Sequence, residues 1–189
     1  MDGNRRWARR EGLSTAEGHK KGFTALENLL NDFSMLKKEH GVYEYIFYAF
    51  STENWKRSEG EVKSLMDLFR YGLTRIEEAL DSEDRPRIRF IGNRDHFDDD
   101  IQKEIMRIEE ETKDGDGVVA IALSYGGRDE IVRAVQKADE LTEEGIQQAL
   151  DTNGMQDPDL IIRTGGEKRL SNFLLWQAAY SEFFFVEKF

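Results

Sequence analysis

The chain has 189 residues, 39% of them hydrophobic and 34% charged, which fits a soluble globular protein large enough to bury a core. Its net charge of −11, from 38 acidic and 27 basic residues, argues against a nucleic-acid partner, because a phosphate backbone needs a basic surface. It has no cysteine and no apolar run near 18 residues. This excludes disulfides and suits a cytoplasmic protein without a membrane span.

The chain opens on a polar segment that contains a carboxylate, a glycine, an amide and two guanidiniums within five positions. Arginine forks match phosphate oxygens, and a carboxylate can hold a divalent cation. One interpretation is a Mg²⁺–diphosphate site. The other is an aspartate N-cap and a turn before an exposed basic helix. The residues of this segment are Asp2, Gly3, Asn4, Arg5, Arg6 and Trp7.

Helical and strand periodicities then alternate along the chain. Apolar residues at helical spacing over 26–36 predict a helix, and the apolar run at 43–50 predicts a buried strand. A continuous apolar face over 62–80 predicts one long helix that ends before Pro86. The further predicted elements are strands at 87–91, 118–123, 160–162 and 183–186, and helices at 98–112, from 131, at 142–150 and at 172–180.

This alternation predicts a single α/β domain over residues 1–189, with a central, mostly parallel sheet covered by helices on both faces. Polar segments follow three of the predicted strands, at 51–57, 124–128 and 163–167. Because open α/β sheets bind ligands at the carboxyl ends of their strands, we expect these segments to form the site.

Four blocks, in order, resemble the signatures of the cis-prenyltransferases, the undecaprenyl diphosphate synthase family. The first joins the opening segment MDGNRRWA to Gly18-His19-Lys20-Lys21-Gly22. The second is FSTENWKR at 50–57, and the third is YGGRDEI at 125–131. The fourth is RTGGEKRLSNFLLWQ at 163–177, which continues to Glu182. Together the blocks span nearly the whole chain.

The resemblance implies a homodimeric, Mg²⁺-dependent enzyme. It would condense isopentenyl diphosphate with an allylic diphosphate, farnesyl or geranylgeranyl diphosphate, to a cis-polyprenyl diphosphate and release diphosphate. The growing chain would enter an apolar tunnel between the helix at 62–80 and the sheet, and the product would associate loosely with membranes. The alternative is a non-catalytic subunit of a heteromeric cis-prenyltransferase. Such a subunit is expected to lose the catalytic aspartate and the phosphate arginines, which this chain keeps.

The resemblance also implies roles for single residues. It makes Asp2 and Asn54 catalytic, and it assigns Mg²⁺ to Asp2 and Glu182. Taken as ordinary residues, His19 is structural or solvated and Trp55 belongs to a core. The implied substrate-binding residues are Gly3, Asn4, Arg5, Arg6, Trp7 and His19 for the allylic diphosphate, Ser51, Thr52, Glu53, Trp55 and Arg57 in the second block, and Arg163, Arg169 and Ser171 for isopentenyl diphosphate.

Two further expectations concern the aspartate triplet and the chain ends. Asp98-Asp99-Asp100 lacks the spacing of the Asp-Asp-x-x-Asp metal motif and is interpreted as a helix N-cap. In the resembled family a strand precedes the first block, and an Arg-x-Gly segment that reaches the partner's site follows the last strand. We therefore expect the chain to be clipped at both ends.

Overall fold

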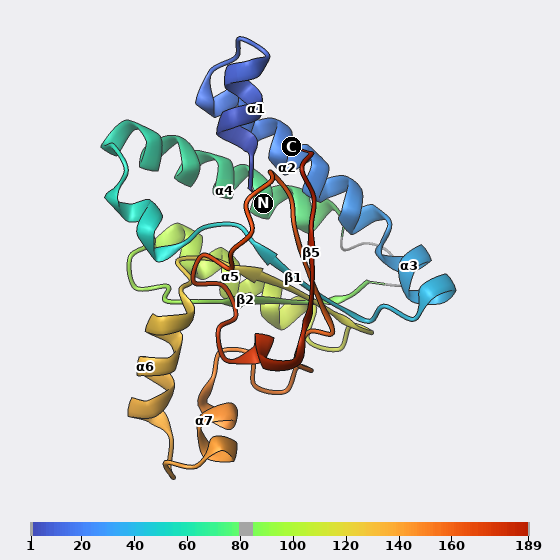
Figure 1. The fold of residues 1–189 in the computed structure, drawn as a ribbon, viewed down its shortest axis with the longest axis vertical. Helices are drawn as coiled ribbons and strands as arrows, with labels where there is room; N and C mark the ends of the chain where they lie inside the picture. The colour runs from blue at the N-terminus through green and yellow to red at the C-terminus, as the bar shows by residue number, and fades with distance from the viewer. Residues whose placement is uncertain (1, 80–84, 189) are drawn as a thin grey trace.

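The computed structural model describes residues 2–79 and 85–188, and the side chains of 77–79 are not considered. Met1 and the predicted helix end at Leu80 lie outside the described residues. The fold is mixed α/β, with helices around parallel strands (Figure 1). The helices are α1 (Asn4–Arg10), α2 (Thr15–Asn31), α3 (Phe33–His40), α4 (Glu59–Ala79), α5 (Asp99–Glu111), α6 (Gly127–Lys137) and α7 (Glu143–Ala149), with 3-10 helices η1 (Thr52–Lys56) and η2 (Gln177–Tyr180). The strands are β1 (Glu44–Tyr48), β2 (Arg87–Ile91), β3 (Val118–Ala122), β4 (Leu160–Arg163) and β5 (Glu182–Phe185).

The predicted parallel strands are confirmed, but in the described residues they form two sheets rather than one. Strands β1, β3 and β2 pair in that order, with Glu44 and Arg87 both opposite Val118. Strands β4 and β5 form a separate parallel pair that begins with Leu160 opposite Glu182. All three strands of the larger sheet therefore end at the same edge.

The two faces of the larger sheet are covered by different parts of the chain. Odd-numbered β3 residues such as Val119 and Ile121 pack with apolar side chains of α4 and α5, and Ile105 and Ile108 of α5 are fully buried. On the other face Ala122 packs in a smaller cluster with Tyr125 and Leu174, so the C-terminal segment covers it. Covering both faces is what the apolar strand β3 requires.

Two predicted helices differ from the structure. Residues 26–36, predicted as one helix, contain the junction between two helices, because α2 ends at Asn31 and α3 begins at Phe33. The helix predicted over 172–180 is wrong: only η2 at its end is helical, since Asn172 and Leu174 adopt left-handed φ angles of 65° and 45°. A right-handed helix cannot continue through such residues.

Helix α1 lies directly on α2 because α2 carries glycines where the two helices meet. A Cβ atom on Gly18 would lie 2.5 Å from the Asn4 carbonyl oxygen and 2.7 Å from the Ala8 Cβ. A Cβ atom on Gly22 would lie 2.3 Å from the Asn4 side-chain nitrogen. The Gly-His-x-x-Gly spacing thus brings the opening segment of the chain against His19.

We expect Gly18→Ala to destabilise the protein by about 1–3 kcal/mol, because the added methyl overlaps backbone atoms of α1. Gly60, also in a helix, faces open space, and a methyl added there would have no neighbouring atom within 4 Å. Gly60→Ala is therefore a matched control, which should leave stability unchanged or raise it by about 0.4–1 kcal/mol. Chemical denaturation of both variants measures the difference, and equal effects would contradict the close packing of α1 on α2.

Candidate functional site

The site is organised around the carboxylate of Asp2, which joins the beginning of the chain to the end of β4. Arg163 donates to its Oδ2 from Nη2 at 2.8 Å and from Nε at 3.3 Å. Arg6 pairs with Oδ1 at 3.1 Å, and the Gly3 N–H donates to Oδ1 at 2.7 Å. Thr164 donates its hydroxyl to the Asp2 carbonyl at 3.1 Å. Asp2 therefore has two guanidiniums beside it.

Asp2 is ionised in this environment. Partial burial opposes the charge, but hydrogen bonds from Arg163 and the Gly3 N–H, with the nearby Arg6 charge, outweigh it and lower the pKa of Asp2. Gly3 caps α1 at a φ of 101°, a left-handed conformation that only glycine adopts without strain. The N-cap position of α1 is therefore occupied by Gly3 and not by Asp2, whose side chain pairs with Arg6 and Arg163.

A second carboxylate, Glu167, connects two of the predicted phosphate-binding arginines. Arg6 donates to its Oε1 at 3.1 Å, and Arg169 donates to its Oε2 at 2.5 Å. Arg163 also donates to the Ser171 hydroxyl at 2.9 Å. Arg6, Arg163, Arg169 and Ser171 thus form one cluster, which we call the Asp2 cluster. The sequence resemblance grouped Arg6 with His19 at the predicted allylic diphosphate site. These contacts instead place Arg6 beside the residues predicted to bind isopentenyl diphosphate.

A second group of cations lies beside His19. Glu61 of α4 accepts from Arg57 at 2.7 Å and lies 3.8 Å from Arg5. Burial first, and then the charges of Arg57 and Arg5, lower the pKa of His19 and favour the neutral ring. We call Arg5, Arg57, Glu61 and His19 the Glu61 cluster. Trp7 lies half-buried on α1.

Helix η1 follows β1 and carries Asn54 and Trp55. The Asn54 side-chain oxygen accepts from the Ser51 N–H at 2.9 Å, which closes the first turn. Trp55 donates its indole N–H to the Ser124 hydroxyl at 2.9 Å, and its ring packs edge-on against Phe50. The ring of Trp55 therefore packs against the core and also lines a pocket, and its substrate-binding role stays a prediction.

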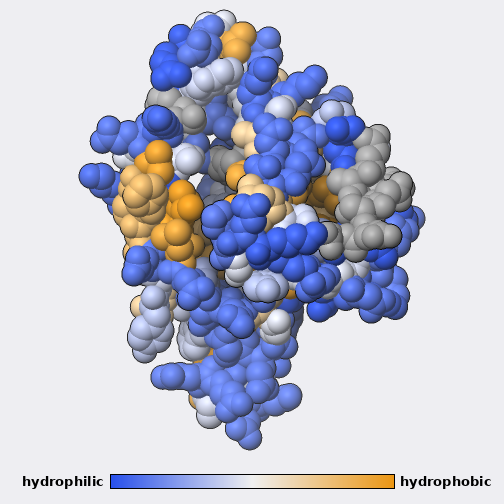
Figure 2. All heavy atoms as spheres, turned by 90° about the vertical axis from the view of Figure 1, so that its right-hand side faces the viewer, coloured by the Kyte–Doolittle hydropathy of each residue, from blue (hydrophilic) through white to orange (hydrophobic). Residues whose placement is uncertain are grey.

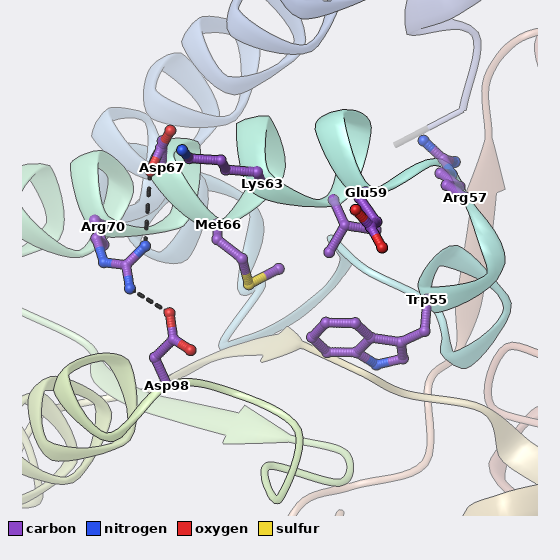
Figure 3. Close-up of a pocket in the computed structure, with 9 residues that line it drawn as sticks. Trp55, Arg57, Glu59, Lys63, Met66, Asp67, Arg70 and Asp98 are labelled. Carbon is purple, nitrogen blue, oxygen red and sulfur yellow. Dashed lines mark hydrogen bonds and ion pairs between the residues drawn. The ribbon is translucent and has the colours of Figure 1, made fainter.

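That pocket, of about 410 Å³, lies outside η1 and along the first turns of α4 (Figure 3). Trp55 lines the pocket from η1, and Lys63 and Met66 line it from α4. Arg70 forms an ion pair with Asp98, the first residue of the aspartate triplet, at 2.5 Å. Asp98 occupies the predicted N-cap position of α5, but its side chain makes no cap hydrogen bond.

An apolar cavity of about 110 Å³ lies between α2, α4 and the larger sheet. Its polar residues are Asn4 and His19, and its other lining residues include Phe23, Ala49 and Leu73. The cavity lies where the sequence predicts a tunnel, and His19 of the Glu61 cluster is one of its lining residues. A continuous tunnel stays a prediction.

Glu182 does not lie beside Asp2. It begins β5 opposite Leu160, whereas Asp2 contacts Arg163 at the other end of β4. Among the described residues no three histidine or carboxylate side chains gather as a metal site. Of the two predicted ligands, Asp2 is the one that lies among side chains predicted to bind phosphate, and one carboxylate with substrate phosphates and water is how proteins often hold Mg²⁺.

Comparison with known proteins shows the family of the chain. The family model described as "Putative undecaprenyl diphosphate synthase" matches residues 1–189. The chain belongs to this family. The isoprenyl transferase of Aquifex pyrophilus is 45% identical over 99% of this chain and 81% of its own length. That of Thermotoga maritima is 45% identical over 100% of this chain and 83% of its own.

Among solved structures, lavandulyl diphosphate synthase from Lavandula x intermedia, in complex with dimethylallyl diphosphate, superposes with a TM-score of 0.89. It is 30% identical and covers 100% of this chain and 84% of its own. The family assignment from sequence is confirmed, and so is the α/β fold. The protein is a transferase of the cis-prenyltransferase type. Within the described ranges, every helix falls short of the length and apolar character that a membrane crossing requires.

The structure adds three residues to which the sequence assigned no role. Thr164 and Glu167 hold the Asp2 cluster together, and Asn172 connects η1 to α6. All three lie inside the fourth block at 163–177, so their place in this block is the sequence feature that could have identified them. Each of them has a partner 119 to 162 positions away in the chain, where spacing gives no information.

We expect the free energy of unfolding to depend on pH through His19. Its folded pKa lies below the ordinary 6.5, so the unfolded chain binds more protons between these two values. Stability therefore falls as the pH drops below about 6.5. In His19→Asn this part of the pH dependence should disappear, whereas His40→Asn, an exposed control on α3, should keep it. Identical profiles for wild type and His19→Asn would contradict the neutral ring.

Proposed function

We propose that the protein condenses isopentenyl diphosphate with an allylic diphosphate such as farnesyl or geranylgeranyl diphosphate, releasing diphosphate and forming a cis-polyprenyl diphosphate. The observation that carries the proposal is the pair of arginine clusters beside an apolar cavity. Two diphosphates need two sets of guanidiniums, and a hydrocarbon tail needs an apolar space next to one of them.

The geometry supports one assignment of the two clusters. The Glu61 cluster borders the apolar cavity through His19, so we assign it the allylic diphosphate, whose tail would fill the cavity. The Asp2 cluster, with Arg163, Arg169 and Ser171, would hold isopentenyl diphosphate. Arg6 contacts both Asp2 and Glu167 and would lie between the two substrates.

The chain's own residues would act mainly through charge. As the allylic C–O bond breaks, negative charge grows on the departing diphosphate, and fixed guanidiniums such as Arg5 and Arg57 would stabilise it. The alkene of isopentenyl diphosphate would form the new C–C bond and lose a proton. Asn54, held by the Ser51 N–H, offers an amide near that substrate as a hydrogen-bonding group.

Mg²⁺ fits the Asp2 cluster in a limited sense. Asp2 is an ionised carboxylate beside the arginines expected to bind phosphate, and it would hold the ion together with substrate oxygens. When bound, Mg²⁺ would supply additional positive charge to the diphosphate. Glu182, at the far end of β4 and β5, is not placed to share that ion within this chain.

We further propose a homodimer in the cytoplasm. The support for a dimer is the exposed apolar surface of the β4–β5 pair, where Ile162 and Phe184 are each 60% exposed. In Figure 2, the largest group of apolar atoms lies at the left of a mostly hydrophilic face, with smaller groups elsewhere. Exposed apolar patches of this kind mark interaction surfaces. The absence of cysteine suits a reducing compartment.

The decisive experiment is incubation with radiolabelled isopentenyl diphosphate, with and without farnesyl diphosphate, in Mg²⁺ or in EDTA. Primer-dependent and Mg²⁺-dependent transfer of label into an organic-soluble product is expected. Chromatography of the dephosphorylated product gives its chain length. A non-catalytic subunit would incorporate no label by itself.

Asp2→Ala should reduce turnover by about 10²–10³-fold or more, because it removes a preorganised charge from the reacting centre. Asp2→Asn, which keeps the shape and loses the charge, should fall similarly. Asp139→Asn, on an exposed loop, makes the same chemical change far from the cluster and should leave kcat unchanged. Near-wild-type kcat and unaltered Mg²⁺ dependence in the Asp2 variants would rule the role out.

Arg169→Ala should raise the KM for isopentenyl diphosphate far more than the KM for the allylic primer. Arg169 lies in the Asp2 cluster through Glu167, whereas His19 and the apolar cavity belong to the other site. Arg10→Ala removes an exposed α1 guanidinium that pairs with its chain neighbour Glu11, and it should change neither KM. Equal increases in both KM values for Arg169→Ala would contradict separate sites.

A further inference from the structure

Asn172 lies where three parts of the site meet. Its side-chain nitrogen donates to Glu53 Oε1, on η1, at 3.1 Å. Its side-chain oxygen accepts from the Arg128 N–H at 2.9 Å, and its carbonyl accepts from the Gly127 N–H at 2.7 Å. It also directly follows Ser171, whose hydroxyl binds Arg163. One residue thus contacts η1 and α6 and adjoins the Asp2 cluster.

The contacts of Asn172 require its particular side chain. Its φ of 65° is left-handed, a conformation that asparagine and aspartate adopt more readily than most residues. The side chain then satisfies one of the free N–H groups at the start of α6, as a cap supplied from another segment. A Cβ on Gly126 would lie 2.7 Å from its nitrogen and 2.8 Å from the Thr52 hydroxyl, so the space around it is full.

Of the side-chain hydrogen bonds of Asn172, the one to Glu53 connects it to η1, which carries Asn54 and Trp55. Glu53 also accepts from the Thr52 hydroxyl at 3.2 Å. Burial opposes its charge, but the backbone, Asn172 and Thr52 hydrogen bonds outweigh it and lower the pKa of Glu53, which is therefore an anion. A neutral amide donor matches that anion, and a second carboxylate in its place would repel it.

We propose that Asn172 is a positioning residue that holds η1, with Asn54 and Trp55, at a fixed distance from Arg163 and Ser171. Its side chain hydrogen-bonds to Glu53 and to the first turn of α6, so it acts on the site through these two segments. The kinetic consequence rests on the proposed function. If η1 moves relative to Arg163, the two reacting substrates lose their alignment, and a displacement of about 1 Å can cost up to ~10²-fold in rate.

The test exchanges the amide and the carboxylate. Asn172→Asp keeps an acceptor for the Arg128 N–H and tolerates the left-handed φ, but it places two carboxylates together. The double variant Asn172→Asp/Glu53→Gln restores one donor and one acceptor with the wild-type total charge. Asn153→Asp, on an exposed turn, adds the same charge elsewhere. Glu53→Ala removes the bond to η1 and leaves the α6 cap intact.

Two measurements are made on each variant. Hydrogen exchange should be faster over residues 51–57 in Asn172→Asp and in Glu53→Ala, return towards wild type in the double variant, and stay unchanged in Asn153→Asp. In kinetics, Asn172→Asp should lower kcat and raise the KM for isopentenyl diphosphate by roughly tenfold. The KM for the primer should stay unchanged, and the double variant should recover part of the loss.

The exchange measurement needs no activity, so it separates this inference from the proposed function. A wild-type protein that incorporates no isopentenyl diphosphate would overturn the function, while exchange over 51–57 would still decide the role of Asn172. Unchanged exchange in both Asn172→Asp and Glu53→Ala would overturn the inference. So would additive effects of Asn172→Asp and of Glu53→Gln, which is also measured as a single variant, because a direct interaction gives coupled effects. A lower melting temperature with both KM values unchanged would indicate a purely structural role.

Discussion

The site depends on the attraction between Asp2 and the guanidinium of Arg163, which lie 161 positions apart in the chain. Several arginines close together repel one another, and carboxylates in their midst offset that repulsion. Asp2 and Glu167 do so for one cluster, and Glu61 does so for the other. The carboxylates therefore hold the arginines in fixed positions, as the proposed binding of diphosphates would require.

The position of the two clusters follows from the parallel strands. Strands β1 and β3 end at one edge of the larger sheet, where Ser51 pairs with Tyr125 just beyond them. The segment after β4 reaches that region through Asp2 and through Asn172. Helix α1 is brought in from the other side, because the glycines of α2 let it approach His19. Charged groups from four distant segments therefore converge at one place.

The apolar half of the site uses the same sheet. One face of the sheet carries Phe47, Phe90 and Ile121 into the space beneath α2 and α4, next to Asn4 and His19. Burying these side chains stabilises the fold. Under the proposed function, the remaining cavity would also take up the hydrocarbon tail of the substrate beside the Glu61 cluster, so changes in this cavity would act on both stability and substrate binding.

The sequence by itself determined the α/β class, most elements and the family, because hydrophobic periodicity and ordered motifs are local properties of the chain. It also pointed to Asp2, both through the residues of the opening segment and through the family resemblance, and to Arg163 and Arg169 through the resemblance. The tertiary structure alone decided the division into two sheets, the place of Arg6 beside Glu167, and the distance of Glu182 from Asp2. It also replaced the helix predicted after Ser171 by left-handed turns, because Asn172 caps α6. Contacts between segments more than a hundred residues apart leave no period in the sequence, and only the folded chain shows which charges meet.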